Sequence, residues 1–234
     1  MRVAKEFSRF AKSYNKHNII QVEVVKKLIS YIPKRDYQHI VDIGCGRGEV
    51  YNSLIQEDIS FSSFTALDIS KDMLELHHKD KRVRLIEGDF GKLDTFDTIY
   101  PCDIVISSSA LQWSSDLDIT LDGLSNITKE GYFAIFTSNT FATLHKYANI
   151  ISPIYTKEYL QEKISTYFVN TTFETLTYRL SFESVYKMLR YIKESGTSGG
   201  ESQLSYKQIK RLIEEYPLDY LEFEVLFVRT YKKV

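Results

Sequence analysis

The run VDIGCGRG at positions 41–48 constrains the fold of this chain more than any other feature. An apolar stretch ends in three glycines at alternate positions, and a helical pattern follows at once. This order predicts a strand, a tight turn and the N-terminus of a helix. Glycine permits a positive φ and lets a ligand approach the backbone closely, while the helix N-terminus presents unpaired N–H groups. The run therefore indicates a site for a nucleotide-like ligand, with the spacing G-x-G-x-G rather than the dinucleotide spacing G-x-G-x-x-G.

Strand and helix patterns alternate through the first 140 residues. Apolar strand patterns lie at 39–43, 63–69, 83–87, 103–108 and 131–138, and helical patterns lie at 7–31, 48–57, 70–79 and 115–127. Ser70 is a predicted N-cap, and Gly131 is a predicted stop for the helix that precedes it. Strands that alternate with helices predict a parallel sheet covered on both faces.

The second half of the chain changes character. Helical patterns occupy 142–149, 156–165, 182–194 and 205–215, and alternating strand patterns occupy 173–182 and 220–231. Thr156 is a predicted N-cap, and Ser205 with Gln208 fits a capping box. We expect one domain over 1–234, with an N-terminal helical cap (1–32), a cofactor-binding core (36–140), lid helices with a strand (141–217) and a final strand (218–234).

Composition narrows the classes of partner. The net charge of −1 gives no global sign of nucleic acid or an anionic membrane. No apolar run approaches the roughly 18 residues of a membrane helix, and the N-terminus lacks a signal-peptide core. Two cysteines make no disulfide framework, so we expect reduced thiols in a cytoplasmic protein. No Cys/His cluster has zinc spacing, and we expect His77 and His78 to be solvated helix residues rather than metal ligands.

Four polar signals follow the first four strand patterns, where an open parallel sheet binds its ligands. They are the glycine turn, Asp68, Asp89 within Gly88-Asp89-Phe90, and the segment Ser107–Trp113. A carboxylate at position 68 can accept both hydroxyls of a ribose, and Asp89 beside an aromatic ring suits an adenine. Each signal also has a structural explanation, as a tight turn, a helix cap, an ordinary turn or a core tryptophan. Together they favour a nucleoside site.

These residues resemble the class I S-adenosylmethionine-dependent methyltransferases. Positions 41–48 are similar to the first motif of that class, and the run DISKDML at 68–74 is similar to its second. The resemblance implies a Rossmann-like α/β fold with a seven-stranded sheet, mostly parallel with an antiparallel C-terminal strand, and a helical lid. It implies S-adenosyl-L-methionine as cofactor, S-adenosyl-L-homocysteine as product, and no metal. The implied cofactor-binding residues are Asp42, Gly44, Cys45, Gly46, Gly48, Asp68, Ile69, Met73, Gly88, Asp89, Phe90, Ser107 and Gln112.

Segments outside the core resemble the malonyl-[acyl-carrier protein] O-methyltransferases of biotin synthesis. They are FSRFAKSY at 7–14 with Gln21, ALQW at 110–113, MLRYIKESGT at 188–197 and YPLDY at 216–220. The lid has Gly196-Thr197 where that family has Gly-Ala, and the segment before the fifth strand is Lys129-Glu130-Gly131-Tyr132 rather than Lys-Pro-Gly-Gly. The resemblance implies methyl transfer to the free carboxylate of a malonyl thioester carried by acyl carrier protein or coenzyme A.

A malonyl carboxylate has a pKa of about 4 and is ionised at neutral pH, so the reaction needs no general base. Alignment of the reactants and exclusion of water then remain as the sources of catalysis. Arg190 is our candidate for holding the carboxylate, because a guanidinium fork matches it. Tyr14 and Trp113 are candidates for closing the pocket. Each of these residues has an ordinary alternative, as a surface arginine, a helix-packing tyrosine or a core tryptophan.

A basic face is expected on the lid, where an acidic carrier protein could dock or where the charges are simply solvated. Its residues are Lys187, Arg190, Lys193, Lys207, Lys210 and Arg211. Three other functions stay open at this point. They are a methyltransferase for another small molecule, such as an aconitate-type carboxylate or a quinone ring, an NAD-dependent dehydrogenase that the glycine spacing disfavours, and a non-catalytic cofactor-binding module.

Overall fold

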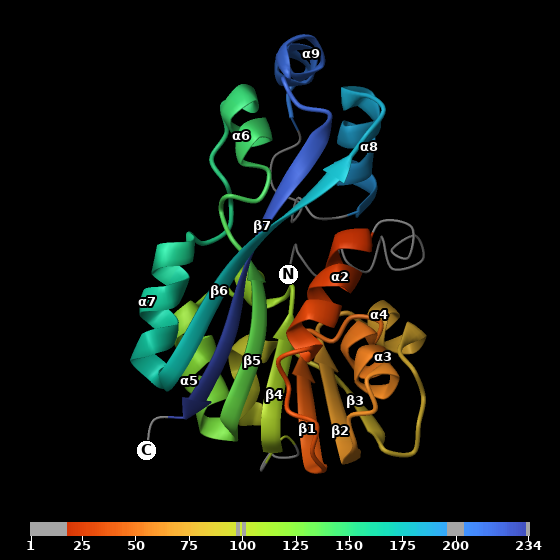
Figure 1. Ribbon diagram of the computed structural model, residues 1–234, viewed down its shortest axis with the longest axis vertical. Helices are drawn as coiled ribbons and strands as arrows, with labels where there is room; N and C mark the ends of the chain where they lie inside the picture. Colours follow the sequence, from red (N-terminus) through yellow and green to blue (C-terminus); the bar gives the residue numbers. More distant parts are fainter. Residues whose placement is uncertain (1–17, 97–98, 100–101, 196–203, 233–234) are drawn as a thin grey trace.

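A computed structural model describes residues 18–96, 99, 102–195 and 204–232 (Figure 1). The strands are β1 (Tyr37–Ile43), β2 (Phe61–Asp68), β3 (Val83–Glu87), β4 (Cys102–Ser108), β5 (Thr128–Phe136), β6 (Phe168–Ser181) and β7 (Tyr220–Lys232). The α-helices are α2 (Ile19–Ile29), α3 (Glu49–Gln56), α4 (Lys71–Leu76), α5 (Leu117–Ile127), α6 (Ala142–Ala148), α7 (Lys157–Tyr167), α8 (Val185–Ser195) and α9 (Tyr206–Glu215), with 3-10 turns η2 (Phe90–Thr95) and η4 (Leu111–Trp113).

The strands form one seven-stranded sheet in the order β3-β2-β1-β4-β5-β7-β6. Strands β1 to β5 pair in parallel, while β7 runs antiparallel to both β5 and β6. The expected fold class, a mostly parallel sheet with an antiparallel C-terminal strand, is confirmed. The chain leaves β1 for β2 on one side and later returns to β4 on the other. Ligands of open α/β sheets bind at such a reversal of strand order, beyond the carboxyl ends of the strands.

Both faces of the sheet are buried, and successive residues alternate between them. Ile40 and Ile104 pack with α2 and α3 in one apolar cluster. Val41 and Val105 pack with α5 and α7 in the other. The next residue of β1 that faces α2 and α3 is Asp42, and this alternation therefore places a carboxyl group in a position otherwise occupied by apolar side chains.

Helix starts follow the predicted caps. The side chains of Ser70, Thr156 and Ser205 accept backbone N–H groups at the starts of α4, α7 and α9. The capping box of Ser205 and Gln208 is present. The prediction for Gly131 is wrong, because α5 ends at Ile127 and Gly131 lies inside β5. A methyl group at Gly131 would lie 2.6 Å from the Phe133 ring, so close side-chain packing explains this glycine.

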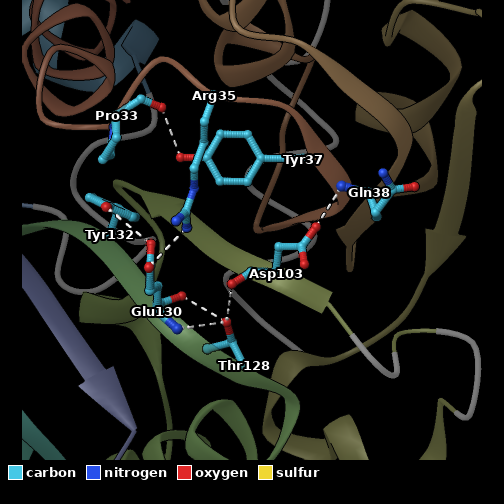
Figure 2. Close-up of polar contacts among 8 residues, drawn as sticks. All are labelled: Pro33, Arg35, Tyr37, Gln38, Asp103, Thr128, Glu130 and Tyr132. Carbon is cyan, nitrogen blue, oxygen red and sulfur yellow. Dashed lines mark hydrogen bonds and ion pairs between the residues drawn. The ribbon is translucent and has the colours of Figure 1, made fainter.

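The amino edge of the sheet holds a polar cluster (Figure 2). The Arg35 guanidinium donates to Glu130 at 2.9 Å and lies over the Tyr37 ring at 4.9 Å. The Tyr132 hydroxyl donates to the other Glu130 oxygen at 3.4 Å. These contacts tie the start of β1 to the start of β5, at the edge opposite the glycine turn. The segment that departs from Lys-Pro-Gly-Gly therefore has a local structural role at the amino edge.

Strands β6 and β7 extend as a twisted ribbon beyond the carboxyl edge of the other strands (Figure 1). Helices α6, α8 and α9 cluster at this end of the molecule, and we call them the upper helices. Their buried residues, among them Leu144, Met188 and Leu212, continue the apolar cluster that also contains α2. Within the described ranges, no helix has both the length and the apolar composition needed to cross a membrane.

Candidate functional site

The glycine turn lies at the carboxyl end of β1, at the reversal of strand order. Its three glycines have positive φ values of +70° at Gly44, +54° at Gly46 and +94° at Gly48, as the sequence predicts. The N–H groups of Gly44 and Cys45 both donate to the Leu67 carbonyl, at 2.8 and 3.0 Å, and so join the turn to β2. A methyl group at Gly44 would lie 2.2 Å from the Cβ of Ala110. The turn is therefore packed closely between the ends of β2 and β4.

Asp68 connects the glycine turn to the end of β2. One carboxylate oxygen accepts the Gly46 N–H at 2.9 Å, and the other accepts the Ser70 N–H at 2.8 Å. Burial raises the pKa of Asp68, while the N–H groups of Ser70, Gly46 and Ile69 act in the opposite direction. An ionised Asp68 thus holds two loops in register, and its remaining lone pairs are available to hydroxyl donors.

Asp42 is the most deeply buried carboxyl group of the site. Its side chain has 0% exposure, and neither oxygen has a hydrogen-bond partner among the described residues. Burial, reinforced by the nearby charges of Asp68 and Glu49, raises its pKa well above the ordinary value. A buried carboxyl group without donors is costly. The arrangement is suited to a ligand that brings hydrogen-bond donors or a positive charge.

Gln112 contributes a second buried acceptor without a partner. Its Nε2 donates to the Ser109 carbonyl at 2.7 Å, which turns Oε1 away, and that oxygen has no partner within the described part of the chain. Gln112 lies in η4, directly after β4. The segment also contains Ser109 with φ +61° and the half-buried Trp113. Ser107 is fully buried, and its hydroxyl donates to the Ile43 carbonyl at 2.8 Å, so its proton is used to bind β4 to β1.

The loop after β3 brings the predicted adenine residues to the same edge. The Gly88 N–H donates to the Asp68 carbonyl at 2.9 Å. Asp89 is exposed and accepts the Gly91 N–H at 2.9 Å as the N-cap of η2. Phe90 is half-buried. Asp89 therefore keeps one oxygen beyond its cap bond that can accept from a ligand.

Three further predicted cofactor residues surround the turn with apolar groups. Ile69 is exposed directly after Asp68, whereas Met73 and Cys45 are buried. Burial is the main cause of a Cys45 pKa well above that of an ordinary thiol. Cys45 is consequently a protonated, apolar neighbour of the turn rather than a nucleophile.

Two polar residues, Asn18 at the N-cap of α2 and Gln21 within this helix, are buried without having been predicted as cofactor ligands. The buried Asn18 donates through Nδ2 to Glu49 at 2.8 Å and so links α2 to the first residue of α3. Gln21, which the sequence comparison singled out only as a resemblance, is buried with Oε1 unpartnered among the described residues. Burial raises the pKa of Glu49, although Arg47 and Asn18 partly counter it. The contact of Asn18 with Glu49 is tertiary, and no sequence spacing reveals it.

The predicted substrate residues are less closely grouped. Arg190 is exposed on α8, and its Nε donates to Glu194 at 2.7 Å. Trp113 lies at the carboxyl edge, whereas Tyr14 falls outside the described residues. The prediction for His77 is wrong: it is buried with 3% exposure at the end of α4, while His78 is exposed as expected. In the part of the chain that the structure describes, no group of three His, Cys, Asp or Glu side chains could hold a metal ion.

Comparisons with known proteins show the family to which the chain belongs. Residues 34–196 match the model of a methyltransferase domain family. The chain belongs to this family. The malonyl-[acyl-carrier protein] O-methyltransferase of Erwinia billingiae is 31% identical over 156 residues, which cover 65% of the chain and 59% of that relative. The enzyme of the same name from Priestia megaterium is 31% identical over 60% of the chain, and the match spans 53% of that relative.

A longer match comes from Neorickettsia risticii. Its malonyl-[acyl-carrier protein] O-methyltransferase is 25% identical over 96% of the chain and 94% of the relative. Solved structures of methyltransferases share the fold at low identity. A SAM-dependent methyltransferase from Archaeoglobus fulgidus has a TM-score of 0.53 at 18% identity and covers 89% of this chain and 94% of its own. The phosphoethanolamine N-methyltransferase 2 of Haemonchus contortus has a TM-score of 0.58 at 16% identity. The match covers 90% of this chain and 52% of that one.

Proposed function

We propose that this methyltransferase transfers a methyl group from S-adenosylmethionine to the free carboxylate of a malonyl thioester. The acceptor is malonyl-acyl carrier protein, and the product is the malonyl methyl ester that enters pimeloyl and biotin synthesis. The names of the relatives from Erwinia billingiae, Priestia megaterium and Neorickettsia risticii support this substrate. The observation that carries the cofactor assignment is the buried, unpartnered carboxyl group of Asp42 beside the glycine turn.

The unpartnered polar atoms of the site are hydrogen-bond acceptors, and this cofactor offers hydrogen-bond donors. Asp42 and Gln112 both offer buried acceptor oxygens, and an amino-acid ammonium group or a ribose hydroxyl is a donor. Asp68 would accept the ribose hydroxyls, and Asp89 would accept the adenine amine. Ile69, Met73 and Phe90 supply apolar surface for the adenine ring, and Cys45 and Ser107 line the turn. Gly46, where a methyl group would meet no atom within 4 Å, lets the cofactor approach the backbone, whereas Gly44, Gly48 and Gly88 allow the close packing that shapes the site. S-adenosylmethionine, when bound, supplies an electrophilic methyl group on a sulfonium.

The chain's own residues have to align the acceptor and exclude water. The malonyl carboxylate is already ionised at neutral pH, with a pKa of about 4, so no side chain needs to remove a proton. Holding two reactants in line can lower the barrier by roughly 7–11 kcal/mol. We assign closure of the pocket to Trp113 and Tyr14, and binding of the malonyl carboxylate to Arg190. An acceptor stripped of water is a stronger nucleophile.

For Arg190 to bind substrate, its guanidinium must leave Glu194. That exchange costs little, because water screens an exposed ion pair and the Arg190 side chain is 65% exposed. Three other basic residues of α8 and α9 are held in the same way. Lys187 pairs with Glu183, Lys210 with Glu214 and Arg211 with Glu215, each four residues away. We propose that an acidic carrier protein docks here by exchanging partners with these pairs.

We propose a corresponding division of the chain. The stretch 36–140 binds the cofactor, 1–32 caps the site, 141–217 covers the acceptor and 218–234 completes the sheet. The described part of the cap contributes Asn18 and Gln21 to the cofactor side. The acceptor would then enter between the glycine turn and the upper helices.

The test is methyl transfer from labelled S-adenosylmethionine to a panel of acceptors. We expect a base-labile methyl ester on malonyl-acyl carrier protein and a slower reaction with malonyl-coenzyme A. Acetyl-acyl carrier protein is the control, because it lacks a free carboxylate. Preference for aconitate or a quinone would overturn the substrate, and failure of the purified protein to bind S-adenosylmethionine in calorimetry would overturn the cofactor as well.

A further inference from the structure

His77 is a buried titratable residue that the proposed reaction does not use. It follows α4, and its Nδ1 lies 3.0 Å from the His78 carbonyl oxygen. A carbonyl can only accept, so Nδ1 carries the proton and donates it. In the neutral ring Nε2 is therefore bare. That nitrogen is buried and has no hydrogen-bond partner among the described residues.

The bare edge of the ring lies against the last glycine of the cofactor turn. A methyl group at Gly48 would lie 2.8 Å from Nε2, 2.9 Å from Cδ2 and 3.0 Å from Cε1 of His77. Gly48 has a φ of +94° and is the N-cap of α3. The imidazole thus fills the space that the missing side chain of Gly48 leaves. Gly46 differs in this respect: its φ is +54°, but a methyl group there would meet no atom within 4 Å.

The surroundings of the ring are aromatic. The ring centroids of Tyr51 on α3 and Phe64 on β2 lie 5.9 and 6.3 Å from that of His77. The titratable neighbours that face this cluster are Tyr51, His78, which stacks on Tyr51, and Asp80, which accepts the Tyr51 hydroxyl at 3.1 Å. Arg82 is a further charged neighbour and pairs with Asp80 at 2.9 Å. Burial is the main cause of the lowered pKa of His77. The hydrogen bond to the His78 carbonyl opposes this shift, and the charge of the His78 ring adds to it, both by less than burial. The ring is consequently neutral at neutral pH.

We propose that His77 is a positioning residue for the cofactor turn: its neutral ring holds Gly48 in place, and protonation of the ring weakens cofactor binding. The inference rests on the proposed function only in taking the turn as the cofactor site. A protonated Nε2 would put a positive charge beside the N-terminus of α3, where the helix dipole is already positive. It would also need an acceptor that the buried cluster does not provide. Both effects push the ring away from Gly48.

A double-mutant cycle read by calorimetry with S-adenosylmethionine tests the contact. Gly48→Ala weakens binding through backbone strain and through collision with the ring. His77→Ala removes the collision, and because it also removes the support that the ring gives the turn, it is expected to weaken binding by itself. Gly48→Ala lowers the affinity for S-adenosylmethionine by a certain factor in the wild type. We expect this factor to be smaller, by about threefold or more, in the His77→Ala background, because the effects of mutating two residues in contact are not independent. Gly46→Ala is the matched control, because it carries the strain without the collision. Its loss of affinity is expected to be the same in both backgrounds.

The pH profile supplies the second readout. His77→Leu keeps apolar bulk against Gly48 but cannot take up a proton, and it remains informative if His77→Ala does not fold. Asp42 also titrates at this site and is present in every variant. The pH profile of each variant is therefore compared with that of the wild type, so that the contribution of Asp42 is common to both. Between about pH 7.5 and about pH 5.5, we expect affinity to fall more steeply in the wild type and in His78→Gln than in His77→Leu.

The outcomes separate the two proposals. Wild-type protein that does not bind S-adenosylmethionine contradicts the proposed function. Wild-type protein that binds it, with no coupling between Gly48→Ala and His77→Ala, contradicts the contact with the turn. Identical pH profiles for the wild type and His77→Leu contradict the role of protonation.

Discussion

The carboxylate of Asp68 accepts the backbone N–H of Gly46 at 2.9 Å, and this bond joins the end of β2 to the glycine turn of β1. The second oxygen accepts the Ser70 N–H at the start of α4. One side chain thus fixes the distance between the two loops that surround the proposed cofactor.

We predict that Asp68→Asn weakens binding of S-adenosylmethionine about 10- to 100-fold. An amide has one oxygen, so one of the two N–H groups loses its acceptor, and the ribose hydroxyls lose a charged one. Hydrogen bonds to charged groups contribute about 1.5–3 kcal/mol each, which gives this range. Calorimetry measures the change. Asp72→Asn, an exposed acid on α4, is the control, and unchanged affinity in Asp68→Asn would refute the ribose role.

The opposite edge of the sheet offers a variant that changes stability alone. One Asp103 oxygen accepts the N–H group of Gln38 at 2.6 Å (Figure 2) and that of His39 at 3.0 Å. We predict that Asp103→Ala lowers the free energy of unfolding by about 1–2 kcal/mol, because it removes two hydrogen bonds that are partly exposed to water and so contribute about 0.5–1 kcal/mol each. Thermal denaturation measures this as a fall in Tm of about 2–8 °C. Affinity for S-adenosylmethionine is expected to stay unchanged, and a parallel loss would contradict the separation of the two edges.

Arg190→Ala is predicted to raise the KM for the acyl substrate about tenfold while leaving cofactor affinity intact, since it removes a charged hydrogen-bond donor. Steady-state kinetics with a malonyl thioester of short, uncharged pantetheine measures the effect without a carrier protein. Arg211→Ala is the matched control, because Arg211 makes an equivalent pair with Glu215 on α9. Equal effects of the two variants on the short substrate would remove Arg190 from the carboxylate site.

Docking of an acidic carrier predicts a dependence on salt. Exposed charges attract one another less as the Debye length falls, from about 10 Å at 0.1 M salt to about 3 Å at 1 M. We therefore expect kcat/KM for malonyl-acyl carrier protein to fall steeply between these concentrations. The value for the short pantetheine thioester is expected to change little. A flat response with the carrier-linked substrate would argue against docking on α8 and α9.

Much of the fold follows from local sequence. The period of two along β1 separates Ile40 from Val41 on opposite faces, and the caps at Ser70, Thr156 and Ser205 start their helices as predicted. These features depend on residues close together in the chain. The strand ends also predict the place of the site, because parallel strands present their carboxyl ends at one edge; Asp68 was singled out on this ground, whereas Asp42 and Gln112 were named as cofactor residues through the resemblance to the methyltransferases.

Features that depend on contacts distant in sequence were not predicted. His77 has the polar neighbours of a solvated residue, but the fold brings Gly48, which has no side chain, against its ring. Gly131 lies shortly after a helical pattern, where a glycine often ends a helix. In the structure it is part of β5, because it pairs with β4 and β7. Asn18 and Glu49 meet only after α2 packs on α3. In each case tertiary packing outweighs the local signal.

Asp42 predicts an unusual dependence of stability on pH in the cofactor-free protein. Burial raises its folded-state pKa well above the ordinary value, so the folded state holds this proton across an interval in which the unfolded chain has lost it. Its contribution to stability is full below the unfolded pKa of about 3.9 and is lost as the pH rises through the folded pKa. The free protein should therefore gain stability from Asp42 on mild acidification.

We predict that Asp42→Asn raises the Tm of the cofactor-free protein at about pH 8 by about 2–4 °C, the shift that about 1 kcal/mol produces in a chain of this size. A neutral amide has neither a charge to bury nor a proton to hold above the ordinary pKa of a carboxyl group. The same variant should bind S-adenosylmethionine more weakly, since it lacks the negative charge that faces the donors. Denaturation scans with and without cofactor measure both effects, and Asp72→Asn again serves as the control. An Asp42→Asn protein that is less stable at pH 8 yet binds the cofactor normally would show that the buried carboxyl group serves the fold and not the cofactor.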